Sequence, residues 1–295
     1  MLEKFFKLSE NHTDAKTEIL AGITTFMTMA YILAVNPSIM AATGMDSGAV
    51  FTATALAAFI GTLLMAIFAN YPFALAPGMG LNAYFAYTVV IGMGYTWQYA
   101  LTAVFAEGII FILLSLTNVR EAIFNAIPMN LKSAVSVGIG LFIAFVGLQN
   151  AHIVVGGSTL LQLFSVDAYN KANGVEASFN NVGITVILAL AGIIITGILV
   201  VKNIKGNILW GILITWGLGI ICQFAGLYVP NADLGFYSLL PDFSKGLSIP
   251  SLTPIFGKLQ FKGIFSVDFI VILFAFLFVD LFDTIGTLVG VSAKA

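Results

Sequence analysis

Eight segments of the chain are apolar over about the length that a helix needs to cross a lipid bilayer. A helix rises about 1.5 Å per residue, so about 20 apolar residues span the hydrocarbon core. Only 9% of the 295 residues are charged, whereas a soluble domain carries about 25% because its surface faces water. The pattern predicts an all-α, polytopic membrane protein in contact with lipid. Its eight spans are expected at 19–39, 49–69, 73–92, 97–117, 133–149, 182–201, 207–228 and 267–291.

The more polar stretches between these spans predict the topology. Residues 118–132 are too polar to cross lipid and are expected to form an interfacial connection, and longer loops are expected at 150–181 and 229–266. Lysine and arginine favour the cytoplasmic side of short loops. With the N-terminus inside, eight of the 12 such residues fall on that side. We therefore expect a cytoplasmic tail at 1–18, an extracytoplasmic loop at 229–266 and a location in the plasma membrane.

Charge, cysteine content and motifs argue against several classes of function. A formal net charge of −2 does not suit a nucleic-acid partner, which requires a clustered basic surface. Cys222 is the single cysteine, so it forms neither an internal disulfide nor a site with other cysteines. No GxxxxGKS/T, HExxH or GxSxG motif is present, so neither an ATP-driven protein nor a metal-dependent hydrolase is predicted. No metal and no cofactor are expected.

The third apolar segment, NYPFALAPGMGLNAYFAY, is interrupted by two prolines. Pro72 and Pro77 cannot donate backbone hydrogen bonds and disfavour helix in the preceding residue. We expect residues 71–78 to be extended and a half-helix to begin near Met79. Irregular backbone at membrane depth is tolerated only where protein buries it or a polar cavity borders it. The half-helix would point free N–H groups at that cavity, and Asn82 would add an amide. The alternative is a tight loop whose glycines merely allow close packing.

The eighth apolar segment contains two acids, in the sequence VDLFDTIGT. Asp280 and Asp283 are three residues apart and share one face of a helix. Each intramembrane aspartate costs about 3 kcal/mol on insertion scales, so the pair requires a polar environment. Burial and mutual repulsion favour holding a proton near neutral pH. Thr284 and Thr287 extend the polar face. The alternative is a pair near a helix end that reaches the membrane interface.

A third intramembrane acid, Glu107, lies in the apolar run TAVFAEGIIFILL. No basic residue lies within one helical turn of it. One interpretation is a second proton site, and the other is a hydrogen-bonded packing or gating residue. Together with Asp280 and Asp283, Glu107 completes the set of candidates for proton coupling.

Three motifs, TTFMTMAYILAVNP, APGMGLNAYFAY and VDLFDTIGT, occur in this order and together resemble the nucleobase–cation symporters. The match is with the adenine/guanine/hypoxanthine permease branch, from about residue 3 to the last residue. The resemblance implies a seven-plus-seven inverted-repeat transporter fold with a core domain and a gate domain. In that fold the third and tenth segments are part strand, part half-helix, and they meet near the bilayer centre.

The resemblance also implies a division of the chain and an incomplete molecule. Residues 19–228 would form the first inverted repeat of seven spans, and 267–295 the first span of the second repeat. The tenth segment and the remainder of the second repeat are not among these 295 residues. We therefore expect a fragment, truncated after the eighth span, that does not transport alone.

By the same resemblance, the base lies between the third segment and the eighth span. Asp283 falls on the acid that hydrogen-bonds the base, while Asn82 and Ala83 fall where the third segment offers side-chain and backbone groups. Thr287 is a further substrate-binding candidate. The chemistry agrees, because carboxylate, amide and N–H groups match the edge of a purine while aromatic rings cover its face. Candidate aromatic residues are Phe26, Tyr84 and Phe85.

The leading hypothesis is therefore a permease that imports a purine base by proton symport. One alternative is an anion carrier of the same fold, which a half-helix N-terminus suits but two carboxylates oppose. A second is a membrane-embedded enzyme that uses Asp280 and Asp283 as a catalytic pair, although no nucleophile or metal motif accompanies them. The preferred purine, coupling to H⁺ or Na⁺, and a homodimeric or other assembly stay open.

Overall fold

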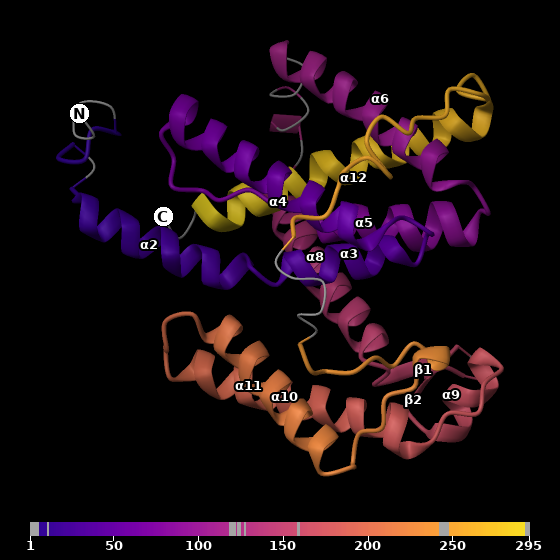
Figure 1. Ribbon diagram of the computed structural model, residues 1–295. Helices are drawn as coiled ribbons and strands as arrows, with labels where there is room; N and C mark the ends of the chain where they lie inside the picture. The colour runs from indigo at the N-terminus through magenta and orange to yellow at the C-terminus, as the bar shows by residue number, and fades with distance from the viewer. Residues whose placement is uncertain are drawn as a thin grey trace. The chain divides into compact units, whose positions relative to one another are not determined.

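The chain forms two compact units, each described by itself below (Figure 1). The computed structural model describes residues 6–10, 12–117, 122, 125–126, 128–157, 160–241 and 248–292, and it leaves out the side chains of 129, 132–133, 135–136, 139 and 285–292. Unit 1 comprises Met1–Tyr31, Ala66–Ala74 and Phe145–Ser248, and unit 2 comprises Ile32–Met65, Leu75–Ala144 and Ile249–Ala295.

Unit 2 consists of apolar helices, and a side chain caps the first turn of α4. The Asp46 carboxylate accepts a hydrogen bond from the Ala49 N–H at 2.7 Å, where α4 begins. Such a cap satisfies one of the N–H groups that the first turn leaves unpaired. The helices are α3 (Ile32–Ala41), α4 (Ser47–Leu64), α5 (Met79–Ala83) with its continuation η2 (Tyr84–Gly92), α6 (Trp97–Leu116) and α12 (Val267–Ser292). Two further elements, η1 (Met65–Ala69) and α8 (Met129–Asn150), include residues of both units.

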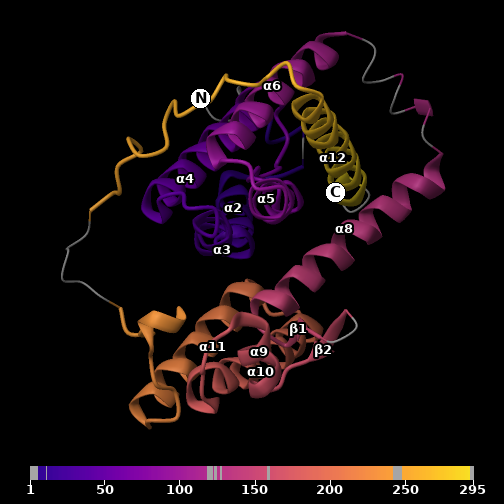
Figure 2. The same ribbon diagram turned by 90° about the vertical axis from the view of Figure 1, so that its right-hand side faces the viewer.

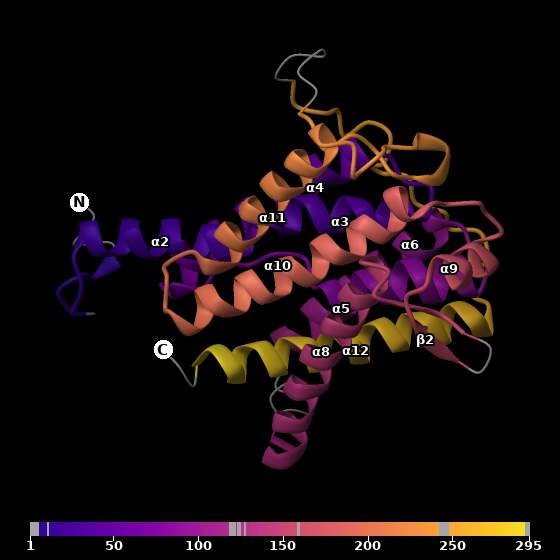
Figure 3. The same ribbon diagram turned by 90° about the horizontal axis from the view of Figure 1, so that it is seen from below.

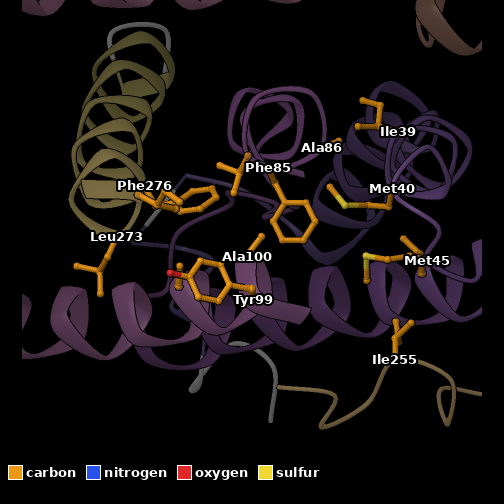
Figure 4. Close-up of a cluster of buried hydrophobic side chains, with 14 of the residues drawn as sticks. Ile39, Met40, Met45, Phe85, Ala86, Tyr99, Ala100, Ile255, Leu273 and Phe276 are labelled. Atoms are coloured by element: carbon orange, nitrogen blue, oxygen red, sulfur yellow. The ribbon is translucent and has the colours of Figure 1, made fainter. Parts of the chain in front are cut away.

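The core of unit 2 lies between α12, α6 and the α5–η2 helix. α12 packs along α6 and against α5, and α5 also contacts α3 (Figure 2). Phe276 of α12 is 1% exposed and lies close to Phe85 of η2, with ring centroids 6.4 Å apart. Tyr99 of α6 belongs to the same cluster (Figure 4). This packing holds the eighth predicted span against the third.

Unit 1 contains a close pair of helices, α10 and α11, which lie side by side (Figure 3). Gly192 of α10 faces Thr215 of α11, and Gly211 of α11 faces Thr196 of α10. Small residues allow helix backbones to approach closely in lipid, where dispersion forces drive association. The helices of unit 1 are α2 (Ala15–Met29), α9 (Val166–Asn173), η3 (Phe179–Gly183), α10 (Ile184–Val201), α11 (Asn207–Phe224) and η4 (Ala232–Leu234).

The segment expected as a loop at 150–181 has regular structure. β1 (Val154–Gly156) pairs antiparallel with β2 (Leu161–Leu163), and α9 follows with the Ser165 hydroxyl accepting from the Ala168 N–H at 3.1 Å. Tyr169 packs its ring against His152 and Phe236. The expectation of an all-α chain therefore needs a small correction, because these residues bury apolar side chains against one another and pair their backbone.

Each of the eight predicted spans contains helix in the structure, although helix in the third begins only at Met79. Among the described residues, five helical stretches are long and apolar enough to cross a membrane: Ala15–Ala41, Ser47–Ala69, Trp97–Leu116, Phe179–Val201 and Asn207–Phe224. Met79–Gly92 and Gly140–Asn150 are shorter apolar helices, and α12 covers the eighth predicted span. Many large apolar side chains on these helices are exposed, as expected for a protein that faces lipid. Of the 15 residues in the predicted connection at 118–132, seven lie outside the described residues, and 129–132 form the start of α8.

Residues 70–78 have no regular secondary structure, and α5 begins at Met79. This confirms the predicted start of the half-helix and its extended approach, since Gly78 has φ −70° and ψ 122°. No strand is formed at 71–78 in the described part of the chain. A strand requires a pairing partner, and none of the described residues pairs with this segment. One predicted helix end was wrong, because α11 ends at Phe224 before the left-handed Gly226, whose φ is 72°.

Candidate functional site

A carboxylate from α12 lies at the start of the half-helix in unit 2. A Cβ built on Gly78 would lie 2.7 Å from Oδ2 of Asp283, so the carboxylate approaches the Gly78 backbone as closely as only a glycine permits. Gly78 is the N-cap of α5 and provides no side-chain cap. The first-turn N–H groups that follow Gly78 have no partner within the helix, and they carry a partial positive charge. The two segments singled out in the sequence therefore meet, and a carboxylate faces a helix N-terminus.

Asn82 lies one turn into α5 and is held by a chain of buried polar groups. Its N–H donates to the Gly78 carbonyl at 3.1 Å, while its Nδ2 donates to Oδ1 of Asn36 at 2.7 Å. Asn36 Nδ2 in turn donates to the Thr54 hydroxyl at 2.7 Å. Asn36 on α3 is 6% exposed and Thr54 on α4 is 2% exposed. Three helices thus fix the position of one amide.

The neighbours of Asn82 have different surroundings. Ala83 is 3% exposed, so its methyl group belongs to the packed interior and only its backbone could reach a ligand. Phe85 is likewise buried in the core cluster, which removes it from the residues available to cover a flat ligand. Tyr84 is half-buried and meets Phe276 edge to face, with ring centroids 5.0 Å apart. Tyr84 is therefore the aromatic candidate that combines partial exposure with a fixed ring.

The three remaining candidates fall in other places. Phe26 lies on α2 in unit 1, where its side chain is exposed. Thr284 is half-buried on α12. Thr287 belongs to α12, but its side chain is outside the described residues.

A second acidic pair connects α12 with α6. The carboxyl groups of Glu107 and Asp280 lie within hydrogen-bonding range of each other. Glu107 is 6% exposed, and its Oε1 atom has no hydrogen-bond partner among the described residues. The two aspartates of α12 therefore have different neighbours, because Asp283 contacts Gly78 of α5 while Asp280 faces Glu107. Facing carboxyl groups in a buried place favour a shared proton over two negative charges.

Asn36 and Thr54, which hold Asn82 in the candidate site, were not identified by the sequence analysis. Asn36 follows the apolar run TTFMTMAYILAV directly, in the first of the three motifs. A lone amide in such a run was an available signal, since an unpaired polar group is costly in lipid. Thr54 gave no such signal, because a threonine can bond to its own helix backbone.

Comparison with known proteins gives the family of the chain. The Permease family matches residues 16–295. The guanine/hypoxanthine permeases PbuG and PbuO of Bacillus subtilis are 44% and 42% identical to it over 100% and 98% of its length. The adenine permease AdeP of Escherichia coli is 38% identical over 100% of the chain. The chain spans 63%, 62% and 60% of these three relatives, respectively.

The match includes the whole of the site described above, from Asn36 to Asp283. Permeases move solutes across membranes, so the alternative of a membrane-embedded enzyme is not supported. The family match extends over residues 16–295, and several of the described helices are long and apolar enough to cross a membrane. The chain therefore belongs to the Permease family.

Proposed function

We propose that the complete protein imports a purine nucleobase across the plasma membrane by proton symport, and that these residues are its N-terminal part. The names of the relatives support this substrate class, since they include guanine/hypoxanthine and adenine permeases. The observation that carries the proposal is the contact of Asp283 with Gly78 at the start of α5. It joins a hydrogen-bond acceptor to a set of backbone donors within one helical turn of Asn82.

Asp283, Asn82, Ala83 and Thr287 are the proposed substrate-binding residues. A purine is flat and presents N–H donors beside ring-nitrogen or carbonyl acceptors. The Asp283 carboxylate and the Asn82 amide oxygen would accept from the donors, and first-turn N–H groups of α5 would donate to the acceptors. A base whose edge does not match leaves buried polar groups unpaired, which gives the site its selectivity.

Glu107 and Asp280 are the proposed proton carriers, with Asp283 coupled to them through α12. Their facing carboxyl groups can hold one proton between them more easily than two charges. Binding or release of that proton would change the charge of α12 one turn from Asp283. A permease that uses a proton gradient requires such a link between the proton and the base.

The proposed architecture is the seven-plus-seven inverted repeat, with residues 19–228 as the first repeat and a cytoplasmic N-terminus. The third segment would acquire a strand partner and a second acid from the tenth segment of the complete protein. Residues 1–295 alone are therefore proposed not to transport. Cells that express only these residues should not accumulate labelled hypoxanthine or adenine, and substrate-specific accumulation would overturn this part of the proposal.

An anion carrier of the same fold is the alternative, and the position of Asp283 opposes it. A helix N-terminus attracts an anion, but here a carboxylate already lies against the start of α5 and would repel a second negative charge. Uptake of labelled hypoxanthine by cells that express the full-length protein tests the choice. Excess adenine or guanine should compete and excess sulfate should not. Competition by sulfate without competition by purines would contradict the proposed function.

A further inference from the structure

The Asn36–Asn82 contact belongs to a chain of hydrogen bonds whose direction is fixed at one end. The Thr54 hydroxyl is 2.7 Å from the carbonyl oxygen of Val50. A carbonyl only accepts, so the single hydroxyl hydrogen of Thr54 is donated there. Toward Asn36 the Thr54 oxygen can then only accept.

This direction determines how both amides are oriented. Because the Thr54 oxygen accepts, Asn36 presents its NH₂ group to it, at 2.7 Å. The Asn36 carbonyl oxygen therefore faces Asn82, which must present its own NH₂ group, also at 2.7 Å. The nitrogen and oxygen of a side-chain amide are assigned from such networks, and here the network admits one assignment.

We propose, on the basis of the proposed function, that Asn36 and Thr54 are positioning residues that make Asn82 a hydrogen-bond acceptor toward the base. One of the two N–H donors of Asn82 Nδ2 is engaged by Asn36, which fixes the rotation of the amide and turns Oδ1 away from Asn36 as an acceptor for a ligand. Reversing the amide would break the bond to Asn36 and place two oxygens against each other. The burial of Asn36 and Thr54 makes that cost high, because water cannot replace the lost partners.

The consequence is a substrate preference that a freely rotating asparagine would not give. In this orientation Oδ1 of Asn82 accepts from an N–H group of the base, and Asp283 in its ionised form would accept from another. Both side chains can thus accept from N–H groups of the same base. A base whose N–H is replaced by N–CH₃ at the position facing Asn82 loses the bond and also meets steric conflict.

The test compares Thr54→Val with Thr54→Ser in the full-length protein. Valine keeps the shape of the side chain but cannot accept from Asn36, whereas serine still can. For each variant, KM and maximal rate are measured with labelled hypoxanthine. Inhibition constants are then measured with N-methylated hypoxanthines, each of which lacks one N–H donor. Rates are normalised to the amount of protein in the membrane.

In Thr54→Val we expect KM for hypoxanthine to rise about tenfold, the scale of one buried hydrogen bond, while the maximal rate changes little. The discrimination against one of the methylated bases should fall by about the same factor, and Thr54→Ser should restore both. Thr52→Val is the matched control. Thr52 is also buried on α4, but its hydroxyl donates to the Pro250 carbonyl at 2.8 Å, away from Asn82. It should keep the wild-type KM and discrimination.

Wild-type KM and discrimination in Thr54→Val would overturn the positioning role. If Thr54→Val does not reach the membrane, Asn36→Ala removes the same partner of Asn82 and is judged by the same two quantities. Failure of the proposed function is distinguishable, because then the wild-type protein itself would not take up hypoxanthine.

Discussion

The Asp283 carboxylate lies against the Gly78 backbone, where a Cβ would come within 2.7 Å of Oδ2. This contact joins α12 to the start of α5, the two segments in which the apolar pattern of the chain is interrupted. A carboxylate near a helix N-terminus is stabilised by the N–H groups there. The absence of a side chain at Gly78 is what permits the approach.

Gly78→Ala should therefore displace Asp283 and weaken substrate binding. The added methyl group cannot coexist with the carboxylate in its present position, and displacements of about 1 Å at a binding group cost tenfold or more in transport efficiency. KM for hypoxanthine uptake in the full-length protein measures the effect. Gly217→Ala is the control, because a Cβ there meets nothing within 4 Å. An unchanged KM in Gly78→Ala would show that the contact does not position Asp283 for the base.

Glu107→Gln should uncouple transport from the proton gradient. Glutamine cannot bind or release a proton here, so the proton can no longer be shared between residue 107 and the Asp280 carboxyl group. One pH unit of gradient is worth about 1.4 kcal/mol, or about tenfold accumulation, and the variant should lose this driven part. Exchange of labelled for unlabelled base should persist.

Asp268→Asn is the matched control for Glu107→Gln. Asp268 is an exposed acid in the first turn of α12 whose Oδ2 accepts from the Tyr95 hydroxyl at 2.8 Å, apart from the Glu107–Asp280 pair. Asparagine keeps an acceptor there, so driven accumulation should stay at the wild-type level. Gradient-driven accumulation by Glu107→Gln equal to that of the control would exclude Glu107 from coupling.

Close packing of α10 against α11 makes unit 1 sensitive to added volume at their contact. A Cβ at Gly192 would lie 2.6 Å from the Thr215 hydroxyl, which donates to the Gly211 carbonyl at 2.8 Å. Gly192→Ala should lower the free energy of unfolding by about 1–3 kcal/mol through overpacking. Thermal unfolding in detergent measures it. Gly197→Ala on the same helix meets nothing within 4 Å and should unfold at the wild-type temperature or above.

We expect the stability of unit 1 to depend on pH because of the buried His152. Burial against Tyr169 and Phe236 lowers the pKa of His152 from its usual value of 6.5. Below pH 6.5 the unfolded chain therefore binds more protons than the folded chain, and stability falls as pH falls through this range until the folded side chain is also protonated. The midpoint temperature of thermal unfolding should fall as the pH is lowered from about 7.5 to about 5.5. His152→Phe should reduce that drop, whereas His12→Gln at an exposed position should not. Equal pH dependence in all three proteins would contradict the assignment.

Most of the helical organisation could be predicted because lipid imposes one simple requirement on sequence. About 20 apolar residues in succession indicate a span, and each predicted span contains helix, the third from Met79 onward. Turns were harder. Helix α11 ends at Phe224, before Gly226 with its left-handed conformation. The sequence did not indicate this end, because the apolar run continues to Tyr228. The β1–β2 hairpin escaped prediction because its strands are only three residues long.

The candidate site could be predicted where a polar or helix-breaking residue lies in an apolar segment. It could not be predicted where it depends on contacts that form only in the folded protein. Asp283 and Pro77 are anomalous in apolar segments, so sequence alone identified their neighbourhood. The division of the two aspartates between Gly78 and Glu107 depends on how α12 packs, which spacing along one helix cannot reveal. Thr54 is an ordinary residue in α4, and its role follows only from its distance to Asn36.

The most direct test of the account is hypoxanthine uptake by the full-length protein with Asp283→Asn, measured beside Asp268→Asn. Loss of the charged acceptor should raise KM about tenfold to a hundredfold, with normal amounts of protein in the membrane and wild-type KM in the control. Undiminished high-affinity uptake by Asp283→Asn would remove Asp283 from the site and contradict the central claim.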